Sequence, residues 1–203
     1  MKRAFLGVFA TLVLSVVILV VQAQRHVVTS YSVVINAPVE KVWDFLSDNR
    51  NAKGWSVIFD HISPMASSPV PEGQIGALRR CFRNVNEQGF FWDERTLSSE
   101  PYIERTLRTY NVSNTSWDLF EKFQFTAYQK YEDLGNGQTR LTFEGDLDDY
   151  TKYNTFERFI FWVSQHEGER VFRLNLENIK AMLEQGENYQ RPHPWEEQSP
   201  FDA

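Results

Sequence analysis

The sequence predicts an α+β protein with one strand, two short helices, six further strands and a long C-terminal helix. Three observations lead to this prediction. An alternating apolar run stops at Asn36-Ala37-Pro38 and passes directly into an amphipathic helical pattern. From Trp55 to about residue 150, short alternating segments are separated by turn residues. Helical periodicity returns after residue 153 and lasts for about 31 residues.

The length fits a single globular domain. The chain has 203 residues, and about 160 remain without the apolar N-terminus and the polar C-terminal tail. We expect a leader over residues 1–24, a domain over residues 25–186 and a flexible polar tail over residues 187–203. The 16 Phe, 8 Tyr and 6 Trp supply either a large core or a core with a lined cavity, and composition does not separate the two.

Charge and cysteine content exclude two classes of function. The net charge is −6 at pH 7, and an acidic domain without a basic stripe is a poor binder of nucleic acid. The single cysteine, Cys81, excludes an internal disulfide framework and a multi-thiolate metal site. We expect no metal and no cofactor, and Cys81 is interpreted as a small packed residue.

The N-terminal sequence predicts a targeting signal. Lys2 and Arg3 precede an uncharged run from Ala4 to Val21, which would span roughly 27 Å as a helix. The length of this hydrophobic helix favours an uncleaved anchor, although Val21-Gln22-Ala23 also fits cleavage before Gln24. The positive residues place the domain outside the cytoplasm, on the periplasmic side in a bacterium, as a single-pass membrane protein or, after cleavage, a secreted one.

The first elements follow from propensity and spacing. The β-branched and aromatic run over residues 26–35 predicts a strand that ends before Pro38. Pro38 suits a first helical turn, and Val39, Val42, Trp43 and Leu46 share one face of the short helix that follows. A second helical turn is expected over residues 49–55.

Six strands are expected after the short helices, and their turn-rich connections favour a meandering antiparallel sheet. Asn136-Gly137 is the strongest hairpin signal among these connections. The expected strands lie near residues 57–63, 76–84, 89–97, 102–112, 118–132 and 138–147.

The long helix has both termini marked. Asn154 or Thr155 is a suitable N-cap, Gly186 a suitable stop, and Gly168 is expected to mark a bend. Its expected apolar face consists of Phe156, Phe159, Ile160, Val163, Val171, Leu174, Ile179, Met182 and Leu183.

Four segments carry a resemblance to a known superfamily. "INAPVEKVWDFLSDNRNAKGW" resembles the start of START-like, polyketide cyclase-type (SRPBCC) domains, and "IGALRRCFRN" resembles their glycine-plus-arginine strand. "FWDERTL" is similar to their Glu-Arg-Leu strand, with Thr96 between the arginine and the leucine, and "LENIKAMLE" resembles the end of their last helix. The resemblance covers about residues 28–185. It implies the helix-grip fold, in which a curved sheet wraps around the last helix and the short helices close one end of a groove.

The resemblance implies binding of a hydrophobic ligand, since members of the superfamily carry lipids, sterols, hormones and quinones and some cyclise polyketides. In hormone-binding members the glutamate of the Glu-Arg-Leu strand faces the cavity, which would carry over to Glu94. Strand parity adds Trp92 and Thr96 to the same face. The alternative is that Glu94 is a solvated strand residue.

Further candidates for the groove come from parity on the other elements. Glu121, Phe123 and Phe125 share one face of their strand. For residues 138–147 either Leu141, Phe143 and Gly145 or Thr142, Glu144 and Asp146 point inward, so Phe143 and Glu144 are both candidates. Tyr110, which shares a face with Arg108, and the helix residues Phe159, Val163 and Val171 complete the set.

Arg79 and Arg80 are neighbours on one strand and must face opposite ways. At most one of them enters the groove, where Glu94 would be its partner. The alternative is that both arginines lie on the surface.

Catalytic patterns are mostly absent. "HEGER" lacks the second histidine of a zinc helix, and "DLDD" lacks the glycine and glutamate of a calcium loop. There is no nucleophile elbow, phosphate loop or dinucleotide fingerprint. The remaining catalytic hypothesis is an acid and base pair formed by Glu94 and Glu121.

Three functions therefore stay open. We favour binding or transport of a hydrophobic small molecule or lipid in the groove of a membrane-tethered or exported domain. The first alternative is a polyketide cyclase or dehydratase-like enzyme that uses cavity carboxylates. The second is an interaction module whose groove is filled. The oligomeric state is not predicted.

Overall fold

The computed structural model describes residues 14–22, 28–113, 122, 124–186, 189–190 and 192. Along the chain the elements are β1 (Val28–Ile35), α2 (Val39–Ser47), η1 (Asn49–Asn51), α3 (Ala52–Trp55), β2 (His61–Pro64), β3 (Leu78–Phe82), β4 (Phe91–Glu100), β5 (Glu104–Ser113), β6 (Phe125–Gly135), β7 (Gln138–Leu147), η2 (Tyr150–Lys152) and α5 (Thr155–Gln185). The seven strands form one antiparallel sheet in the order β1-β7-β6-β5-β4-β3-β2. The predicted helix-grip fold is confirmed.

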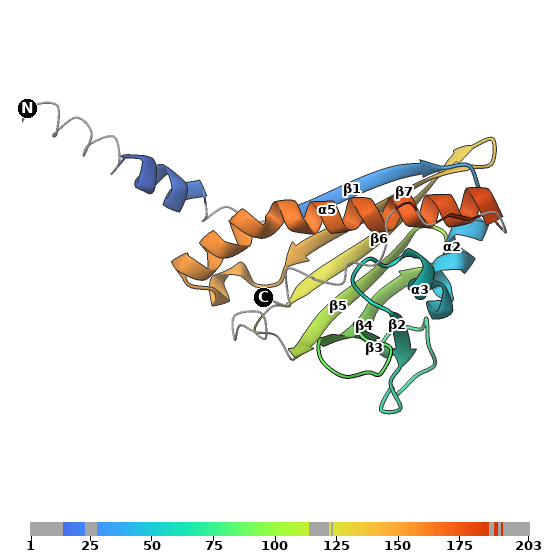
Figure 1. Ribbon diagram of the computed structural model, residues 1–203, viewed down its shortest axis with the longest axis horizontal. Coiled ribbons are helices and arrows are strands. Elements are labelled where there is room, and N and C mark those ends of the chain that lie inside the picture. The colour runs from blue at the N-terminus through green and yellow to red at the C-terminus, as the bar shows by residue number, and fades with distance from the viewer. Residues whose placement is uncertain are drawn as a thin grey trace, which may run out of the picture.

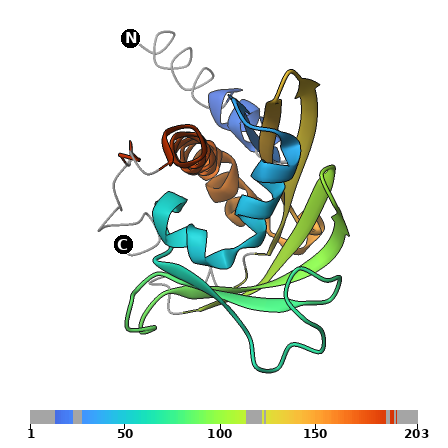
Figure 2. The ribbon, with the colours of Figure 1, turned by 90° about the vertical axis from the view of Figure 1, so that its right-hand side faces the viewer.

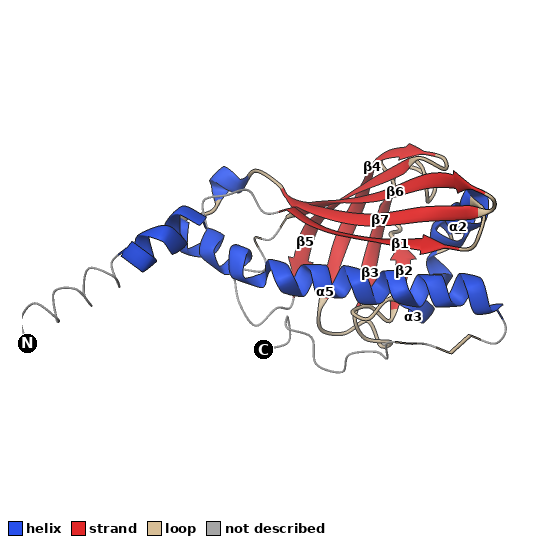
Figure 3. Ribbon diagram, turned by 90° about the horizontal axis from the view of Figure 1, so that it is seen from above, coloured by secondary structure: helices blue, strands red, loops and turns tan. Residues whose placement is uncertain are grey.

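The sheet and α5 form two layers (Figure 1). Seen from above, α5 runs along the sheet with its C-terminal half under β1 and β7 (Figure 3). An end-on view shows the curved sheet with α5, α2 and α3 on its concave side (Figure 2). We call the concave side of the sheet the inner face.

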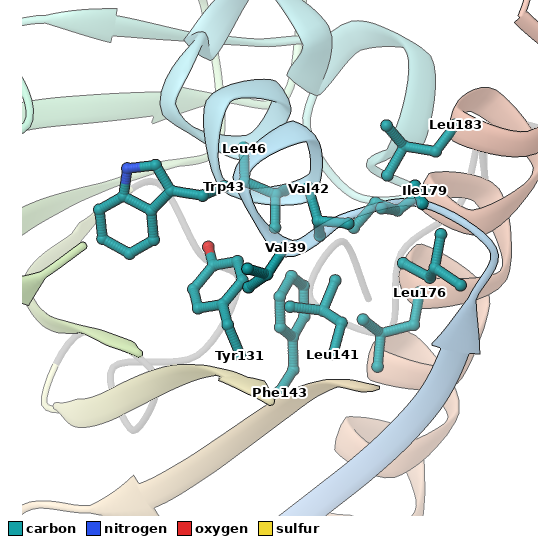
Figure 4. Packing of buried hydrophobic residues seen from close by; sticks show 12 residues of the cluster. Val39, Val42, Trp43, Leu46, Tyr131, Leu141, Phe143, Leu176, Ile179 and Leu183 are labelled. Atoms are coloured by element: carbon teal, nitrogen blue, oxygen red, sulfur yellow. The ribbon is translucent and has the colours of Figure 1, made fainter. Parts of the chain in front are cut away.

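The passage from β1 into α2 closes one end of the space between sheet and α5. Pro38 is the extended N-cap of α2, which buries Val39, Val42, Trp43 and Leu46 as the spacing predicts. These side chains meet Tyr131, Leu141 and Phe143 from the sheet and Leu176, Ile179 and Leu183 from α5 (Figure 4). The hydrophobic side chains of α2 therefore cover the end of the space between the sheet and the C-terminal part of α5.

The ends of α5 are set by local chemistry. The Asn154 side chain accepts hydrogen bonds from the backbone N–H groups of Phe156 and Glu157, and Glu157 reaches back to the Asn154 N–H. This capping box satisfies N–H groups that have no partner within the helix. At the other end, Gly186 follows the helix with a positive φ of 57°.

Gly168 lies within the continuous helix α5, and the bend expected at this glycine stays a prediction. A Cβ atom at position 168 would lie 3.4 Å from the Cγ2 atom of Thr29 on β1. The glycine therefore lies where the N-terminal half of α5 comes close to the first strand.

The Asn136-Gly137 hairpin has the predicted geometry. Gly135 pairs with Gln138, so the loop has two residues, and Asn136 and Gly137 both have positive φ. Positive φ at both positions is the signature of a type I′ turn.

The strand predicted over residues 57–63 is wrong at its start, because β2 begins at His61. Ser56 Oγ accepts hydrogen bonds from the N–H groups of Ile58 and Phe59, and Asn175 Oδ1 accepts from the N–H of Val57. Side-chain oxygens thus take the donors that a strand would use for pairing.

The leader and the tail fall mostly outside the described residues. Of residues 1–24, only residues 14–22 are described, and they are helical. Within the described ranges, no helix combines the length and the apolar character needed to cross a membrane. Of the tail predicted over residues 187–203, only residues 189, 190 and 192 are described.

Candidate functional site

Aromatic side chains from three strands and α5 line the inner face. The rings of Trp92 on β4 and Phe125 on β6 meet edge to face, with centroids 5.4 Å apart. Phe143 on β7 meets Phe172 on α5 in the same way at 6.0 Å. Trp92 and Phe125 on the sheet and Phe172 on α5 are only half-buried although they lie between the two layers. The inner face therefore keeps apolar, partly exposed rings beside the middle of α5.

Gly145 lies opposite these rings. A Cβ atom at this position would be 3.1 Å from the Phe172 ring and 3.9 Å from the Phe125 ring. A larger residue would displace Phe172, so the glycine keeps space on the inner face of β7.

Glu94 is held by two side chains on the same face. Its Oε2 accepts from Arg79 Nε at 2.7 Å, and its Oε1 accepts from Trp92 Nε1 at 3.0 Å. Arg79 Nη1 also donates to Asn49 Oδ1 at 3.1 Å. Only 14% of the Arg79 side chain and 7% of the Glu94 side chain are exposed. Burial has the largest single effect on Arg79 and lowers its pKa, but Glu94, Cys81 and Glu72 together outweigh burial and the net pKa is raised.

Arg80 faces the other way, as parity requires. It forms an ion pair with Asp93 at 2.6 Å, and Asn111 donates to the same carboxylate at 2.7 Å. The interpretation of both arginines as surface residues is therefore wrong for Arg79. The Arg79–Glu94 pair expected for a groove arginine is present.

The register left open on β7 is resolved. Leu141 and Phe143 are buried in the inner cluster, so Gly145 faces inward with them. Glu144 points outward and binds Lys130 on β6 at 2.9 Å. The inward alternative for Glu144 is therefore wrong.

Tyr110 also points outward, contrary to the expected orientation. Its ring lies 5.9 Å from the Arg95 guanidinium, and its hydroxyl lies 3.6 Å from Met65 Sδ. Tyr110 and Arg108 do share a face, but it is the outer one, because the alternate residues Leu107 and Thr109 are the buried ones. The β4–β5 register shift between Asp93 and Glu94 changes the alternation only beyond Tyr110.

The predicted helix residues divide into two groups. Val171 is buried against the sheet, and Phe159 is half-buried beside Trp162 with ring centroids 6.0 Å apart. Val163 is 52% exposed, so its expected place in the groove is wrong. Phe156, another member of the expected apolar face, is 66% exposed. The first turns of α5 carry apolar residues around more of the helix than the sheet covers.

Three further site residues were expected, and the structure describes only one of them. Thr96 is buried on β4, two residues from Glu94. Glu121 and Phe123 lie outside the described residues, so the hypothesis of a Glu94 and Glu121 pair remains a prediction.

No nucleophile or metal cluster accompanies the groove in the described part of the chain. Cys81 is buried on β3, and burial raises the pKa of its thiol well above the ordinary value, which disfavours the reactive thiolate. The described residues contain no group of three or more His, Cys, Asp or Glu side chains that could hold a metal ion.

Arg105 on β5 is a polar residue of the inner face that we did not predict. Its guanidinium lies 4.6 Å from the Trp43 ring and donates to Leu46 O at 3.1 Å and to Ser47 Oγ at 2.6 Å. Its side chain ties β5 to the end of α2. The sequence signal that could have indicated Arg105 is strand alternation, which places it on the same face as Leu107.

Comparison with protein families shows the family of this chain. A family model described as polyketide cyclase / dehydrase and lipid transport matches residues 26–184. The chain belongs to this family. Its fold agrees, and the family supports either a hydrophobic-ligand carrier or a cyclase-like protein. No curated protein matches the chain.

Solved structures share the fold at low identity. The aromatase/cyclase ZhuI from Streptomyces sp. R1128 is 14% identical with a TM-score of 0.56, over 79% of this chain and 95% of that one. A protein from Arthrobacter aurescens is 17% identical with a TM-score of 0.59, over 82% and 91%. DynU16, a putative protein of the dynemicin biosynthetic locus, is 17% identical with a TM-score of 0.56, over 83% of this chain. The match spans about half (51%) of DynU16.

Proposed function

We propose that this protein binds a hydrophobic small molecule or lipid between the inner face of the sheet and the middle of α5. The observation that carries the proposal is the set of half-buried aromatic rings between the two layers, Trp92 and Phe125 on the sheet and Phe172 on α5. A ligand that covers them gains about 25 cal/mol per Å² of apolar surface removed from water. Membership of a family that includes lipid transport proteins supports the same reading.

The state of Glu94 favours binding over acid-base catalysis. Both of its carboxylate oxygens already accept hydrogen bonds, from Arg79 and from Trp92. A general acid or base must reach the substrate proton, and these contacts occupy the groups that would do so. The cyclase-like alternative retains the support of the family description, and turnover of a polyketide-like substrate that is lost in Glu94→Gln would establish it.

Binding is tested with the neutral apolar fluorophore N-phenyl-1-naphthylamine and the full-length chain. We expect saturable binding at one site, weakened about tenfold or more in Phe125→Asp, because a carboxylate would be buried against the ligand. Val163→Asp is the matched control, since Val163 is 52% exposed on α5. Failure of the wild-type protein to bind the probe, or equal weakening in both variants, would contradict the proposal.

We also propose that the chain is held at a membrane with its domain outside the cytoplasm. The support is the sequence, in which Lys2 and Arg3 precede an uncharged run to Val21. Fractionation of cells that express the full chain should place it in the membrane pellet, and external protease should digest the domain in spheroplasts. Recovery in the soluble cytoplasmic fraction would refute the placement.

A further inference from the structure

A narrow recess beside the end of α2 contains two arginines and lies apart from the aromatic rings described above. Its free volume is about 10 Å³, which is the space of a single water-sized group. Its lining includes Ser47, Asn49, Glu72, Arg79, Thr96 and Arg105.

Two buried donors at this recess have no partner among the described residues. Arg105 is 3% exposed and Asn49 is 9% exposed, and neither Arg105 Nε nor Asn49 Nδ2 has a hydrogen-bond partner. The Asn49 amide orientation is forced, because Arg79 can only donate and so faces Oδ1. A buried donor without a partner is costly, so an acceptor placed here would be stabilised.

The local charge is positive on the buried side. Glu94 neutralises Arg79, whereas Arg105 has no carboxylate within 4 Å among the described residues. Burial lowers the pKa of Arg105, and the charge of Arg79 lowers it further, whereas Tyr131 and Glu72 act in the opposite direction. A guanidinium stays charged even so, which leaves an uncompensated buried cation.

A wider cleft of about 630 Å³ lies beside the recess, between α2, η1 and β2. Ser47, Asn49 and Glu72 line both the recess and the cleft. Asp44, Asp48 and Arg50 are the other charged residues of the cleft, and Asp48 and Arg50 pair with each other at 2.6 Å. A ligand can therefore reach the recess without entering the space between the sheet and α5.

We propose that this recess is a second binding site, which takes one oxygen of a small carboxylate while the rest of the molecule lies in the cleft. Arg105 Nε and Asn49 Nδ2 would donate to that oxygen. The narrow recess favours a carboxylate over a tetrahedral oxyanion, which needs space for more oxygens. Glu72 at the shared rim opposes the bound charge and sets an upper limit on the affinity. This site goes beyond the proposed apolar ligand.

The test uses the full-length chain and sodium acetate as the probe, with sodium chloride at equal ionic strength and inorganic phosphate as comparisons. We expect acetate to bind saturably by calorimetry and chloride and phosphate to bind more weakly. Arg105→Met should weaken acetate binding about tenfold or more, because a charge-assisted donor is lost. Arg50→Met is the matched control, since the Arg50 side chain is 90% exposed and lines only the cleft.

Glu72→Gln supplies a second arm that does not depend on the folding of the Arg105 variant. Removing the rim charge should tighten acetate binding about threefold or more. Equal effects of acetate and chloride, unchanged acetate affinity in Glu72→Gln, or unchanged affinity in folded Arg105→Met would each overturn the proposal. Phosphate binding tighter than acetate would overturn the choice of a carboxylate. N-phenyl-1-naphthylamine binding in Glu72→Gln reports the apolar site separately.

Discussion

At the scale of the residue, the inner face combines apolar rings with one buried ion pair. Arg79 and Glu94 come from adjacent strands, and the pair is extended by the Trp92 indole on one side and the Asn49 amide on the other. The charges of Arg79 and Glu94 compensate each other within this network, so an apolar ligand can lie beside the pair without facing an unpaired charge. The pair thus belongs to the wall of the site.

The Arg79–Glu94 pair predicts a non-additive effect on stability. Arg79→Met should reduce the free energy of unfolding by about 3–5 kcal/mol, because it leaves Glu94 buried without its partner. Adding Glu94→Leu should restore most of the loss, since the pair is then replaced by apolar side chains.

Urea denaturation of the four members of this cycle measures the coupling. Arg140→Met is the surface control, because Arg140 and Glu132 form an exposed pair, and it should cost about 0–1 kcal/mol. A loss of that small size in Arg79→Met would show that the pair does not matter for the fold.

Sequence reasoning at this scale found which side chains share a face of a strand. The opposite directions of Arg79 and Arg80, and the partner of Arg79, follow from alternation. Alternation also put Tyr110 and Arg108 on one face, but it could not show that this face is the outer one. The role of Arg105 depends on contacts with α2, about 58 residues away in the sequence.

At the scale of the element, local signals fix where the helices and hairpins begin and end. The Asn136-Gly137 turn, the Asn154 cap and the Gly186 stop are all read from a few adjacent residues. The start of β2 is not, because Asn175 on α5 accepts the hydrogen bond that Val57 would otherwise donate in a strand. Tertiary contacts decide that boundary.

Removing the capping box at Asn154 is expected to lower the stability of the protein measurably. Asn154→Ala removes the acceptor for the N–H groups of Phe156 and Glu157, which should cost about 1 kcal/mol. Chemical denaturation measures the difference, and Asn154→Asp should retain most of the stability because its carboxylate accepts the same bonds. Full stability in Asn154→Ala would mean that the cap contributes nothing.

Alanine substitutions at Gly168 and Gly145 are expected to change the free energy of unfolding in opposite directions. Gly168→Ala should raise the free energy of unfolding by roughly 0.5–1 kcal/mol, since alanine favours a helix and its Cβ would meet Thr29 at an ordinary 3.4 Å. Gly145→Ala should lower it by about 1 kcal/mol or more, because its Cβ would crowd the Phe172 ring. Thermal unfolding of both variants distinguishes them, and stabilisation by Gly145→Ala would contradict this account of the inner face.

At the scale of the whole molecule, α5 does not meet the same surroundings along its length. Its C-terminal half is sealed by α2 and the sheet around Leu176, Ile179 and Leu183 (Figure 4). Near its middle it faces the half-buried rings, and its first turns expose Phe156 and Val163. Helical periodicity predicted a continuous apolar face but could not show where the sheet ends.

The central claim is that the inner face holds an apolar molecule, and native mass spectrometry of the full-length chain tests it most directly. We predict an apolar adduct at one copy per chain, identified by organic extraction, that is lost in folded Phe125→Asp and kept in Val163→Asp. An unliganded mass after incubation with membrane lipid and quinone extracts, or an adduct that survives in both variants, would contradict the claim.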